Sequence, residues 1–219
     1  MTATGNTVVP LLESQVDAAA ELGVRAFRND PMMQYVFPDE DRRQRHGKWF
    51  LERCIRYGLR CGTVHTTEDF AGVVAWIRPE HTPMRLIQVL RSGMLAAPCK
   101  LGWPTFRRFL RLTKAMEAAH QQATPGRHWY LLLLVVDPPH QRRGVGSALL
   151  APGLAQVDND GLPSYLETTT EQNTTYYRKH GFEAWGPQTV AAGVPSFWPM
   201  LREPRKPASQ PADDARGSP

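Results

Sequence analysis

The stretch VVDPPHQRRGVGSALL, residues 135–150, joins three local patterns. An apolar run ends at Asp137-Pro138-Pro139, a short glycine-containing turn follows, and a helix-like pattern of apolar residues begins directly after the turn. A turn between a strand and a helix leaves backbone N–H groups without intrahelical acceptors at the positive end of the helix dipole, which favours phosphate binding. We therefore predict that the amides of residues 142–147 hold a pyrophosphate.

The composition of the turn fits an anion but does not decide the matter. Gly144 and Gly146 have no Cβ, so a phosphate oxygen can approach the backbone, and Arg142 and Arg143 add positive charge. The Gly-Lys-Ser/Thr of a P-loop and the third glycine of a dinucleotide-binding fingerprint are both missing. Taken alone, the turn is explained equally well by an ordinary strand-to-helix connection whose glycines serve only steric needs.

A wider pattern surrounds this turn. It reads Val135-x-Asp137-Pro138-x-x-Gln141-x-x-Gly144-x-Gly146, followed about 30 residues later by Asn173-x-x-x-Tyr177-x-x-x-Gly181-Phe182. In order, spacing and context this pattern resembles the acyl-CoA-binding core of the GNAT acetyltransferase superfamily. Within it, the phrases HQRRGVGSALLAPGLA, YLETT and NTTYYRKHGF are most similar to the group that contains puromycin N-acetyltransferase. The close similarity covers residues 129–182, with a looser one at AFRNDPMMQYVFPDE near the N-terminus.

Apolar periodicity and turn residues divide the chain into alternating helices and strands. We expect strands at 7–12, 63–67, 70–78, 129–136, 164–168, 182–188 and 196–202. We expect helices at 16–27, from Asp39 or Asp41 to Gly62, in two pieces within 80–128, at 144–158 and at 173–180. The run at 129–136 is apolar throughout, which is typical of a strand in the centre of a sheet with both faces covered.

The fold class is therefore α/β (mixed α+β). The resemblance implies the GNAT fold: a central twisted mixed sheet of about six to seven strands, splayed in the middle and flanked by helices. We expect one domain over 1–202, with a helical insert at 80–128 before the cofactor-binding strand. The segment 203–219 lacks large apolar residues, so we expect a disordered tail there.

Composition bounds the class of protein. With 219 residues, of which 42% are hydrophobic, the chain can bury one core of ordinary size. Cys54, Cys61 and Cys99 are too few for a disulfide framework, and no metal-binding spacing accompanies them, so we expect a reducing compartment and no metal. No secretion signal or membrane-length apolar run is present, which favours a soluble, cytoplasmic protein with no membrane association. The net charge of +5 does not select a partner by itself.

The resemblance implies that the bound cofactor is acetyl-CoA (coenzyme A). Its pyrophosphate would lie on the amides of residues 142–147, and its pantetheine would follow the exposed edge of the 133–136 strand. Such a fit needs that strand to splay from the 164–168 strand, and the amide near Val136 would then polarise the thioester carbonyl. The implied cofactor-binding residues are Leu134, Val135, Val136, Gln141, Arg142, Arg143, Gly144, Val145, Gly146, Ser147 and Asn173.

Two further side chains are candidates for proton transfer. Tyr177 stands where the superfamily commonly has a tyrosine that protonates the leaving thiolate, although Tyr176 and Tyr177 also fit core aromatics of a short helix. Asn173 fits the N-cap of that helix, with a cofactor contact as a second role. Glu167 lies at the end of a strand, where burial would raise its pKa and let it accept an amine proton. A salt bridge or a threonine-rich hydrogen-bond network explains Glu167 equally well.

The acceptor site rests on the resemblance alone. Asp30, Tyr35 and Trp49 come from segments that usually form the acceptor pocket, and Glu167 would line it as well. Asp30 either binds an ammonium group or caps a turn before Pro31. His140 and His180 are expected at the surface beside the cofactor.

Together these observations predict an N-acyltransferase. It would move an acetyl group from acetyl-CoA to a primary amine of a small molecule, by direct attack through a tetrahedral intermediate, in antibiotic resistance or secondary metabolism. One alternative is a GNAT-fold transferase whose acyl donor is an aminoacyl-tRNA, because the insert carries basic residues; another is a non-catalytic acyl-CoA-binding regulatory module. Monomer and homodimer both remain open. The basic residues of the insert are Arg85, Arg91, Lys100, Arg107, Arg108, Arg111 and Lys114.

Overall fold

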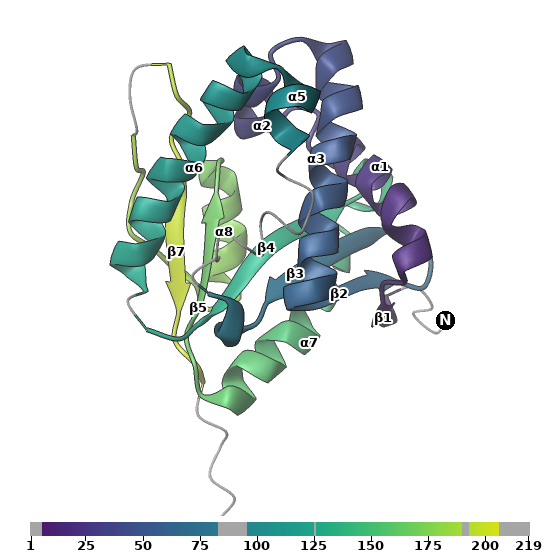
Figure 1. Cartoon of the computed structure of the whole chain (residues 1–219). Helices are drawn as coiled ribbons and strands as arrows, with labels where there is room; N and C mark the ends of the chain where they lie inside the picture. The colour runs from purple at the N-terminus through teal and green to yellow at the C-terminus, as the bar shows by residue number, and fades with distance from the viewer. Residues whose placement is uncertain (1–5, 83–95, 125, 190–192, 206–219) are drawn as a thin grey trace, which may run out of the picture.

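The apolar run at 129–136 forms the middle strand of a seven-stranded sheet (Figure 1). The computed structural model describes residues 6–82, 96–124, 126–189 and 193–205. The strand order is β1-β2-β3-β4-β5-β7-β6. The strands are β1 Val8–Pro10, β2 Gly62–Thr67, β3 Gly72–Ile77, β4 Trp129–Val136, β5 Ser164–Thr168, β6 Glu183–Ala184 and β7 Trp198–Arg202.

One pairing decides the shape of the sheet. Among the described strands, β4 and β5 form the only parallel pair, and all other neighbours are antiparallel. β4 pairs with β5 only at Trp129 with Ser164 and at Tyr130 with Tyr165. Beyond Tyr130 the two strands diverge. The predicted mixed sheet with a splay in the middle is confirmed. Fewer strands are joined by parallel crossover connections than the alternation of strands and helices indicated, because β7 pairs antiparallel with both β5 and β6.

Helices cover both faces of the sheet. The described α-helices are α1 Val16–Ala26, α2 Pro31–Val36, α3 Glu40–Cys61, α5 Ala97–Leu101, α6 Trp103–Ala123, α7 Val145–Asp160 and α8 Glu171–Arg178, with short 3₁₀ turns at Glu13–Gln15, Pro79–His81 and Pro138–His140. Alternate residues of a strand point to opposite faces. In β3, Val73 and Ala75 therefore pack in the cluster with α1 and α3, whereas Val74 and Trp76 pack against α7.

Two helix starts differ from the sequence prediction. Asp30, for which a cap before Pro31 was one of two expectations, accepts a hydrogen bond from the Met33 amide and begins α2, a helix that was not predicted, with Pro31 in the first turn. The last helix begins earlier than expected, because Thr170 is its N-cap. Asn173 therefore lies in the first turn of α8, and its predicted N-cap position is wrong.

The predicted helical insert is confirmed where it is described. α5 and α6 occupy 97–101 and 103–123, and α6 lies along β5 and β7 (Figure 1). Arg85 and Arg91 of the insert, and most of the expected tail at 203–219, lie outside the described residues. Among the described helices, none combines the length and apolarity that a membrane span requires.

Candidate active site

The divergence of β4 and β5 borders a large cavity. Its volume is about 640 Å³, and β4, β5, α2, α3, α6 and α8 all contribute lining residues. Most of the exposed lining is apolar, with aromatic side chains from three different segments, Phe27, Phe50 and Phe109. The carboxylates of Asp30, Glu117 and Glu167 and the cations Arg53 and Lys114 also line it. The cavity is therefore an apolar chamber with a few charged groups on its wall.

The edge of β4 presents backbone polar groups to the gap between the strands. The Asp137 amide donates to the Ala71 carbonyl, 2.9 Å away, and so faces β3. Because successive residues of a strand direct their N–H and C=O groups to opposite sides, Val136 and Leu134 direct theirs away from β3, toward the side of β5. β5 has diverged at this level. An extended ligand in the gap can therefore pair with these two residues in place of a neighbouring strand.

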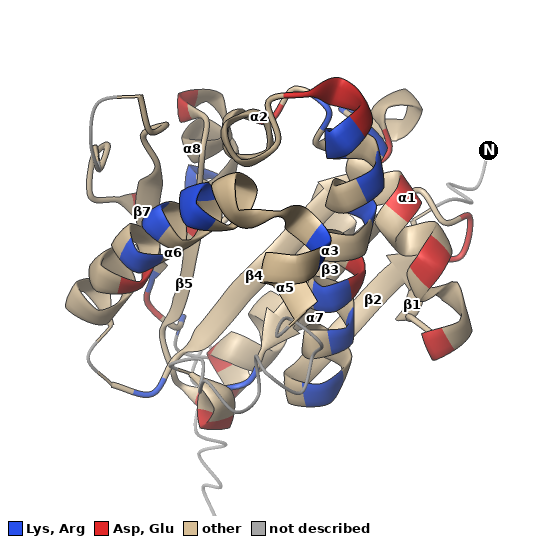
Figure 2. Ribbon diagram, turned by 45° about the horizontal axis from the view of Figure 1, so that its top comes forward, with Lys and Arg blue, Asp and Glu red and all other residues tan. Residues whose placement is uncertain are grey.

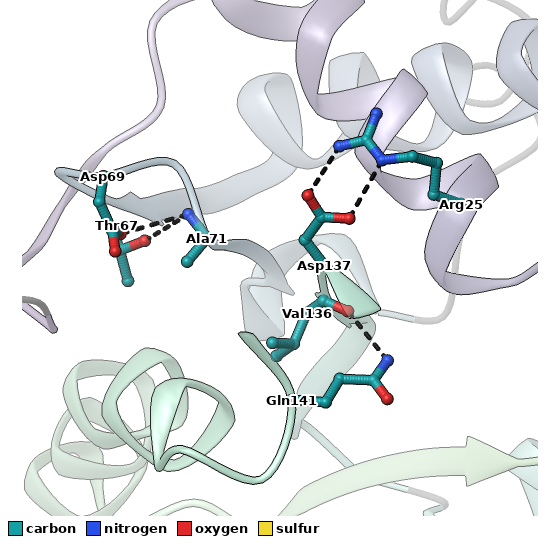
Figure 3. Close-up of polar contacts among 7 residues, drawn as sticks. All are labelled: Arg25, Thr67, Asp69, Ala71, Val136, Asp137 and Gln141. Atoms are coloured by element: carbon teal, nitrogen blue, oxygen red, sulfur yellow. Dashed lines mark hydrogen bonds and ion pairs between the residues drawn. The ribbon is translucent and has the colours of Figure 1, made fainter. Parts of the chain in front are cut away.

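A set of polar contacts holds the end of β4 in place (Figure 3). Arg25 of α1 forms a bidentate ion pair with Asp137, with distances of 3.0 Å from Nε to Oδ1 and 2.9 Å from Nη2 to Oδ2. The Gln141 side chain donates to the Val136 carbonyl at 3.1 Å. Arg25 was missed in the sequence, because an ion pair between residues so far apart leaves no local signal. These contacts fix where the strand ends and the glycine turn begins.

The turn after β4 fits an anion. Gly144 is the N-cap of α7 with φ of 84°, and no side chain caps this helix. Val145 and the next residues therefore present amides at the positive end of the dipole. Arg142 and Arg143 are exposed, and neither side chain forms an ion pair with another described residue. These residues fit the pyrophosphate of coenzyme A, whose binding here stays a prediction.

Gly146 has a structural reason to be glycine as well. A Cβ at this position would lie 2.7 Å from the hydroxyl oxygen of Tyr176, which is too close for an undisturbed contact. The glycine thus lets the start of α7 pack directly against α8. The steric explanation, which the sequence left as one of two alternatives, therefore applies at Gly146, and anion binding at this turn stays a prediction.

The two adjacent tyrosines of α8 lie in different surroundings. Tyr177 and Asn173 line the cavity, and burial raises the pKa of the Tyr177 phenol, which keeps it protonated near neutral pH. Tyr176 instead packs beside Gly146 and the His180 ring, and its buried hydroxyl has no well-formed hydrogen bond among the described residues. Of the two, only Tyr177 lines the cavity. Its role as an acid stays a prediction.

Glu167 lies on β5 and lines the same cavity. Its side chain is 3% exposed, and burial raises the pKa of its carboxyl to about 8. The hydroxyls of Tyr130 and Tyr165 lie near the carboxylate and partly offset this increase, although the Tyr165 hydroxyl falls short of a well-formed hydrogen bond. A carboxyl in these surroundings is protonated at neutral pH and becomes a base at mildly alkaline pH.

Not all of the residues predicted to bind the acceptor line the same cavity. Asp30 lines the cavity, caps α2 and accepts a hydrogen bond of 2.5 Å from the Thr169 hydroxyl, and burial raises its pKa. Tyr35 and Trp49 are absent from the described lining and pack in an apolar cluster between α2, α3 and α6. The Arg53 guanidinium lies 5.8 Å from the centre of the Trp49 ring. Their part in acceptor binding stays a prediction.

The flanking histidines lie beside the turn. Nε2 of His180 is 3.1 Å from the Ser147 hydroxyl at the start of α7, and His140 is half-buried. Sequence reasoning missed the apolar wall of the cavity and a buried histidine pair, His120 and His128. Periodicity shows that such residues face inward but not that they surround a common space. No group of three or more potential ligands arranged for a metal occurs in the described part of the chain.

Known proteins share both the sequence pattern and the fold. Residues 109–184 match the family described as Acetyltransferase (GNAT) domain. A relative from Schizosaccharomyces pombe, named Uncharacterized N-acetyltransferase C550.08, is 29% identical over 171 residues, which cover 75% of this chain and 69% of the relative.

Solved structures share the fold at low sequence identity. A structure from Corynebacterium glutamicum, described as histone acetyltransferase HPA2 and related acetyltransferase, has a TM-score of 0.64 and 22% identity, covering 93% of this chain and 99% of its own. Arylalkylamine N-acetyltransferase 2 from Aedes aegypti has a TM-score of 0.63 and 12% identity, covering 90% and 97%. A polyamine N-acetyltransferase from Drosophila melanogaster has a TM-score of 0.62 and 13% identity, covering 90% and 99%.

Proposed function

We propose that this chain, of which residues 109–184 match the GNAT acetyltransferase domain family, transfers an acetyl group from acetyl-CoA to a primary amine of a small molecule. One observation carries the proposal. The divergence of β4 and β5 brings the free edge of β4, Glu167 and Tyr177 to the same apolar cavity. A donor thioester along β4 and an amine in the cavity would meet between a base and an acid.

The donor would be held by backbone groups. The amides of residues 142–147, with Arg142 and Arg143, would bind the pyrophosphate, and Leu134 and Val136 would pair with the pantetheine in the gap beside β4. Acetyl-CoA supplies the activated thioester. The Val136 amide would donate a hydrogen bond to the oxygen on which negative charge develops, and a preorganised donor of this kind contributes roughly two to three orders of magnitude in rate.

Two side chains would move the protons. Glu167, in its carboxylate form, would take a proton from the amine, whose nitrogen then forms the new bond to the acetyl carbon. As the carbon–sulfur bond breaks, the Tyr177 phenol would donate its proton to the departing sulfur. Each positioned proton transfer contributes typically 10²–10⁴-fold in rate. Protons and charges balance over the cycle once Glu167 returns its proton to solvent and Tyr177 is protonated again.

The lining favours an amine with an apolar body. Aromatic rings from three segments, Phe27, Phe50 and Phe109, would contact that body, while the carboxyls of Glu167 and Asp30 would face the amino group. The structural relatives do not decide between these amines, because arylalkylamine and polyamine N-acetyltransferases match with similar TM-scores, so the choice rests on the apolar lining. We therefore propose arylalkyl or alkyl monoamines in preference to polyamines.

The test is a two-product assay on the purified protein. With acetyl-CoA and a panel of phenylalkylamines, alkylamines and spermidine, free thiol and acetylated amine should appear in equal amounts, fastest with the apolar monoamines. Acetyl-CoA that raises the unfolding midpoint without release of thiol from any amine would favour the non-catalytic binding module.

Ribonuclease tests the other alternative. Figure 2 shows basic residues at several positions along α6. Of the basic residues of α6, Arg107, Arg111 and Lys114 are exposed, and they motivate an aminoacyl-tRNA donor. Under our proposal, ribonuclease leaves the rate unchanged. Activity that is lost with ribonuclease and returns with charged tRNA would replace acetyl-CoA as the donor.

A further inference from the structure

Two buried histidines lie close to Glu167 but are not among the residues that line the cavity. His120 is near the end of α6 and is 5% exposed; His128 directly precedes β4 and is 1% exposed. Their Nε2 atoms are 2.7 Å apart. Two ring nitrogens at this distance share one proton, so one of them must donate and the other must accept.

The backbone decides which nitrogen donates. Nδ1 of His128 lies 2.8 Å from the Gly126 carbonyl oxygen, which can only accept, so Nδ1 carries a proton. Burial lowers the pKa of His128, so this ring is neutral and its Nε2 is an acceptor. His120 must then donate from Nε2. Its pKa is lowered to about 3, mainly by burial, so its Nδ1 carries only a lone pair.

That lone pair faces the proposed base. Nδ1 of His120 is 4.0 Å from Oε1 of Glu167, and both side chains are buried. The His120 ring stacks on Tyr165, with centroids 4.1 Å apart and planes 17° apart, which fixes its orientation. An unprotonated nitrogen cannot donate to the ionised carboxylate, but it can accept a hydrogen bond from the protonated carboxyl. At 4.0 Å the two atoms are beyond hydrogen-bond distance, so the carboxyl would have to move closer to donate to this lone pair.

We propose that His120 is a positioning residue for the transfer reaction: its Nδ1 lone pair, fixed through His128 and the Gly126 carbonyl, accepts a hydrogen bond from Glu167 once this carboxyl has taken the amine proton. The inference rests on the proposed role of Glu167 as base. The step needs no other reactant, since the proton passes from the amine nitrogen to a Glu167 oxygen and stays on that oxygen, hydrogen-bonded to His120.

The predicted pH dependence follows from the sign of this effect. Glu167 acts as a base only when ionised, so kcat/KM should rise as pH increases through its pKa of about 8. Loss of the accepting lone pair removes a contact made only to the protonated form, so the pKa should fall and the acid limb should move to lower pH. The other titratable or charged groups near Glu167 or on the same cavity wall are Glu117 and Lys114 of α6, Tyr130 of β4, Tyr165 of β5, Arg53, Cys54 and Tyr57 of α3, Asp30 before α2 and Tyr177 of α8.

The first experiment needs no catalysis. Nitrogen-15 spectra of the imidazole rings in the full ligand-free protein distinguish the two neutral tautomers and the imidazolium form. At pH 7 we expect His128 protonated only at Nδ1 and His120 only at Nε2, with the signals assigned from His120→Phe and His128→Phe. A proton on Nδ1 of His120, or an imidazolium form of either ring, would overturn the proposal whatever the enzyme acts on.

The second experiment measures pH profiles of kcat/KM with the best acceptor. In His128→Phe, Nε2 of His120 loses its acceptor, so the ring can carry its proton on Nδ1 and donate to the carboxylate; we expect the acid limb to move down by about one pH unit or more. His120→Phe should move the limb in the same direction. The matched control is Thr124→Val, because the Thr124 hydroxyl lies 3.3 Å from the same His128 nitrogen but leaves the tautomers unchanged. Its limb should stay in place.

The outcomes separate the two proposals. If the histidine variants lower the unfolding midpoint but leave the limb where it is, the pair is only structural and the inference fails. If either variant does not fold, the pH titration of the Glu167 carboxyl carbon signal in the other decides between the same two results. If the tautomers are as expected but Glu167→Gln keeps full activity and the same limb, Glu167 is not the base, and both that part of the proposed function and the inference that rests on it fail.

Discussion

Tyr176 and Tyr177 are neighbours in α8, yet they meet different parts of the molecule. Adjacent helical residues point about 100° apart, so one side chain reaches the cavity while the other packs against the start of α7. The phenol of Tyr177 has its pKa raised by burial, and an acid that must protonate a thiolate has to hold its proton until that moment. The geometry therefore gives each tyrosine a separate, testable role.

We expect Tyr177→Phe to lower kcat by about 10²–10⁴ with little change in acetyl-CoA affinity, because only one oxygen is removed and the ring keeps its contact with Phe182. Steady-state kinetics with the best acceptor measure both quantities. Tyr176→Phe is the matched control and should be almost silent. Equal effects in the two variants, or weaker acetyl-CoA binding with an unchanged kcat, would make Tyr177 a structural residue.

At the level of single residues, the sequence predicted several side chains that the structure brings together. Tyr177, Asn173 and Glu167 were predicted from their local positions and Asp30 from the family resemblance, and all four line one cavity. Their functions remain predictions. His120 carries no such local signal, because its significance depends on a partner in another segment and on a backbone carbonyl. Such contacts exist only once the chain has folded.

At the scale of elements, α7 depends on close contact with the sheet. A Cβ at Gly153 would lie 2.2 Å from Nε1 of Trp76, a fully buried ring on β3. The absence of a side chain therefore sets how closely this helix can approach β3. α7 also begins at the turn that would hold the pyrophosphate, so its position matters for binding as well as for stability.

Gly153→Ala should therefore lower the free energy of unfolding by about 1–3 kcal/mol, the usual cost of overpacking a core. Urea denaturation measures the change. Gly126→Ala is the comparison, because a Cβ there has no neighbour within 4 Å and the residue has no positive φ; its stability should change by no more than about 0.5 kcal/mol. A Gly153→Ala protein as stable as the wild type would mean that α7 can shift away from Trp76 at no cost.

Element types were more predictable than element boundaries. The apolar run of β4 and the cap at Asp39 predicted their elements correctly. The short helix α2 was missed: α1 ends at Ala26, and Asp30-Pro31 is the N-cap and first residue of the next helix, not a loop. The strand expected at 182–188 is reduced to Glu183–Ala184 and an isolated bridge from Gln188 to Phe197. Edge pairing depends on the partner strand, which local propensity does not describe.

At the scale of the whole molecule, β4 joins the parts of the proposed site. One of its faces packs with α1 and α3 and the other with α7, its edge diverges from β5, and its end is tied to α1 through Asp137 and Arg25. Binding of a ligand along β4 and the following turn would therefore restrain several layers at once. A ligand that binds only the native state raises the stability of the whole fold, by about 2.7 kcal/mol at a concentration 100 times its Kd.

Charge reversal at the turn should weaken this linkage. Arg143 is exposed and forms no ion pair with any described residue, so Arg143→Glu should leave the unfolding midpoint of the free protein nearly unchanged. It replaces a charge-assisted contact to phosphate, worth about 1.5–3 kcal/mol, with repulsion, so acetyl-CoA should bind at least tenfold more weakly. Thermal scans over a series of acetyl-CoA concentrations should show a smaller upward shift of the midpoint at each concentration. Arg107→Glu makes the same change in net charge at an exposed position of α6. Acetyl-CoA should raise the unfolding midpoint of this control variant as much as it raises that of the wild type. If the acetyl-CoA-induced shift of the midpoint decreases equally in both variants, long-range electrostatics explains the effect. If the shift does not decrease in Arg143→Glu, this arginine does not contact the bound anion.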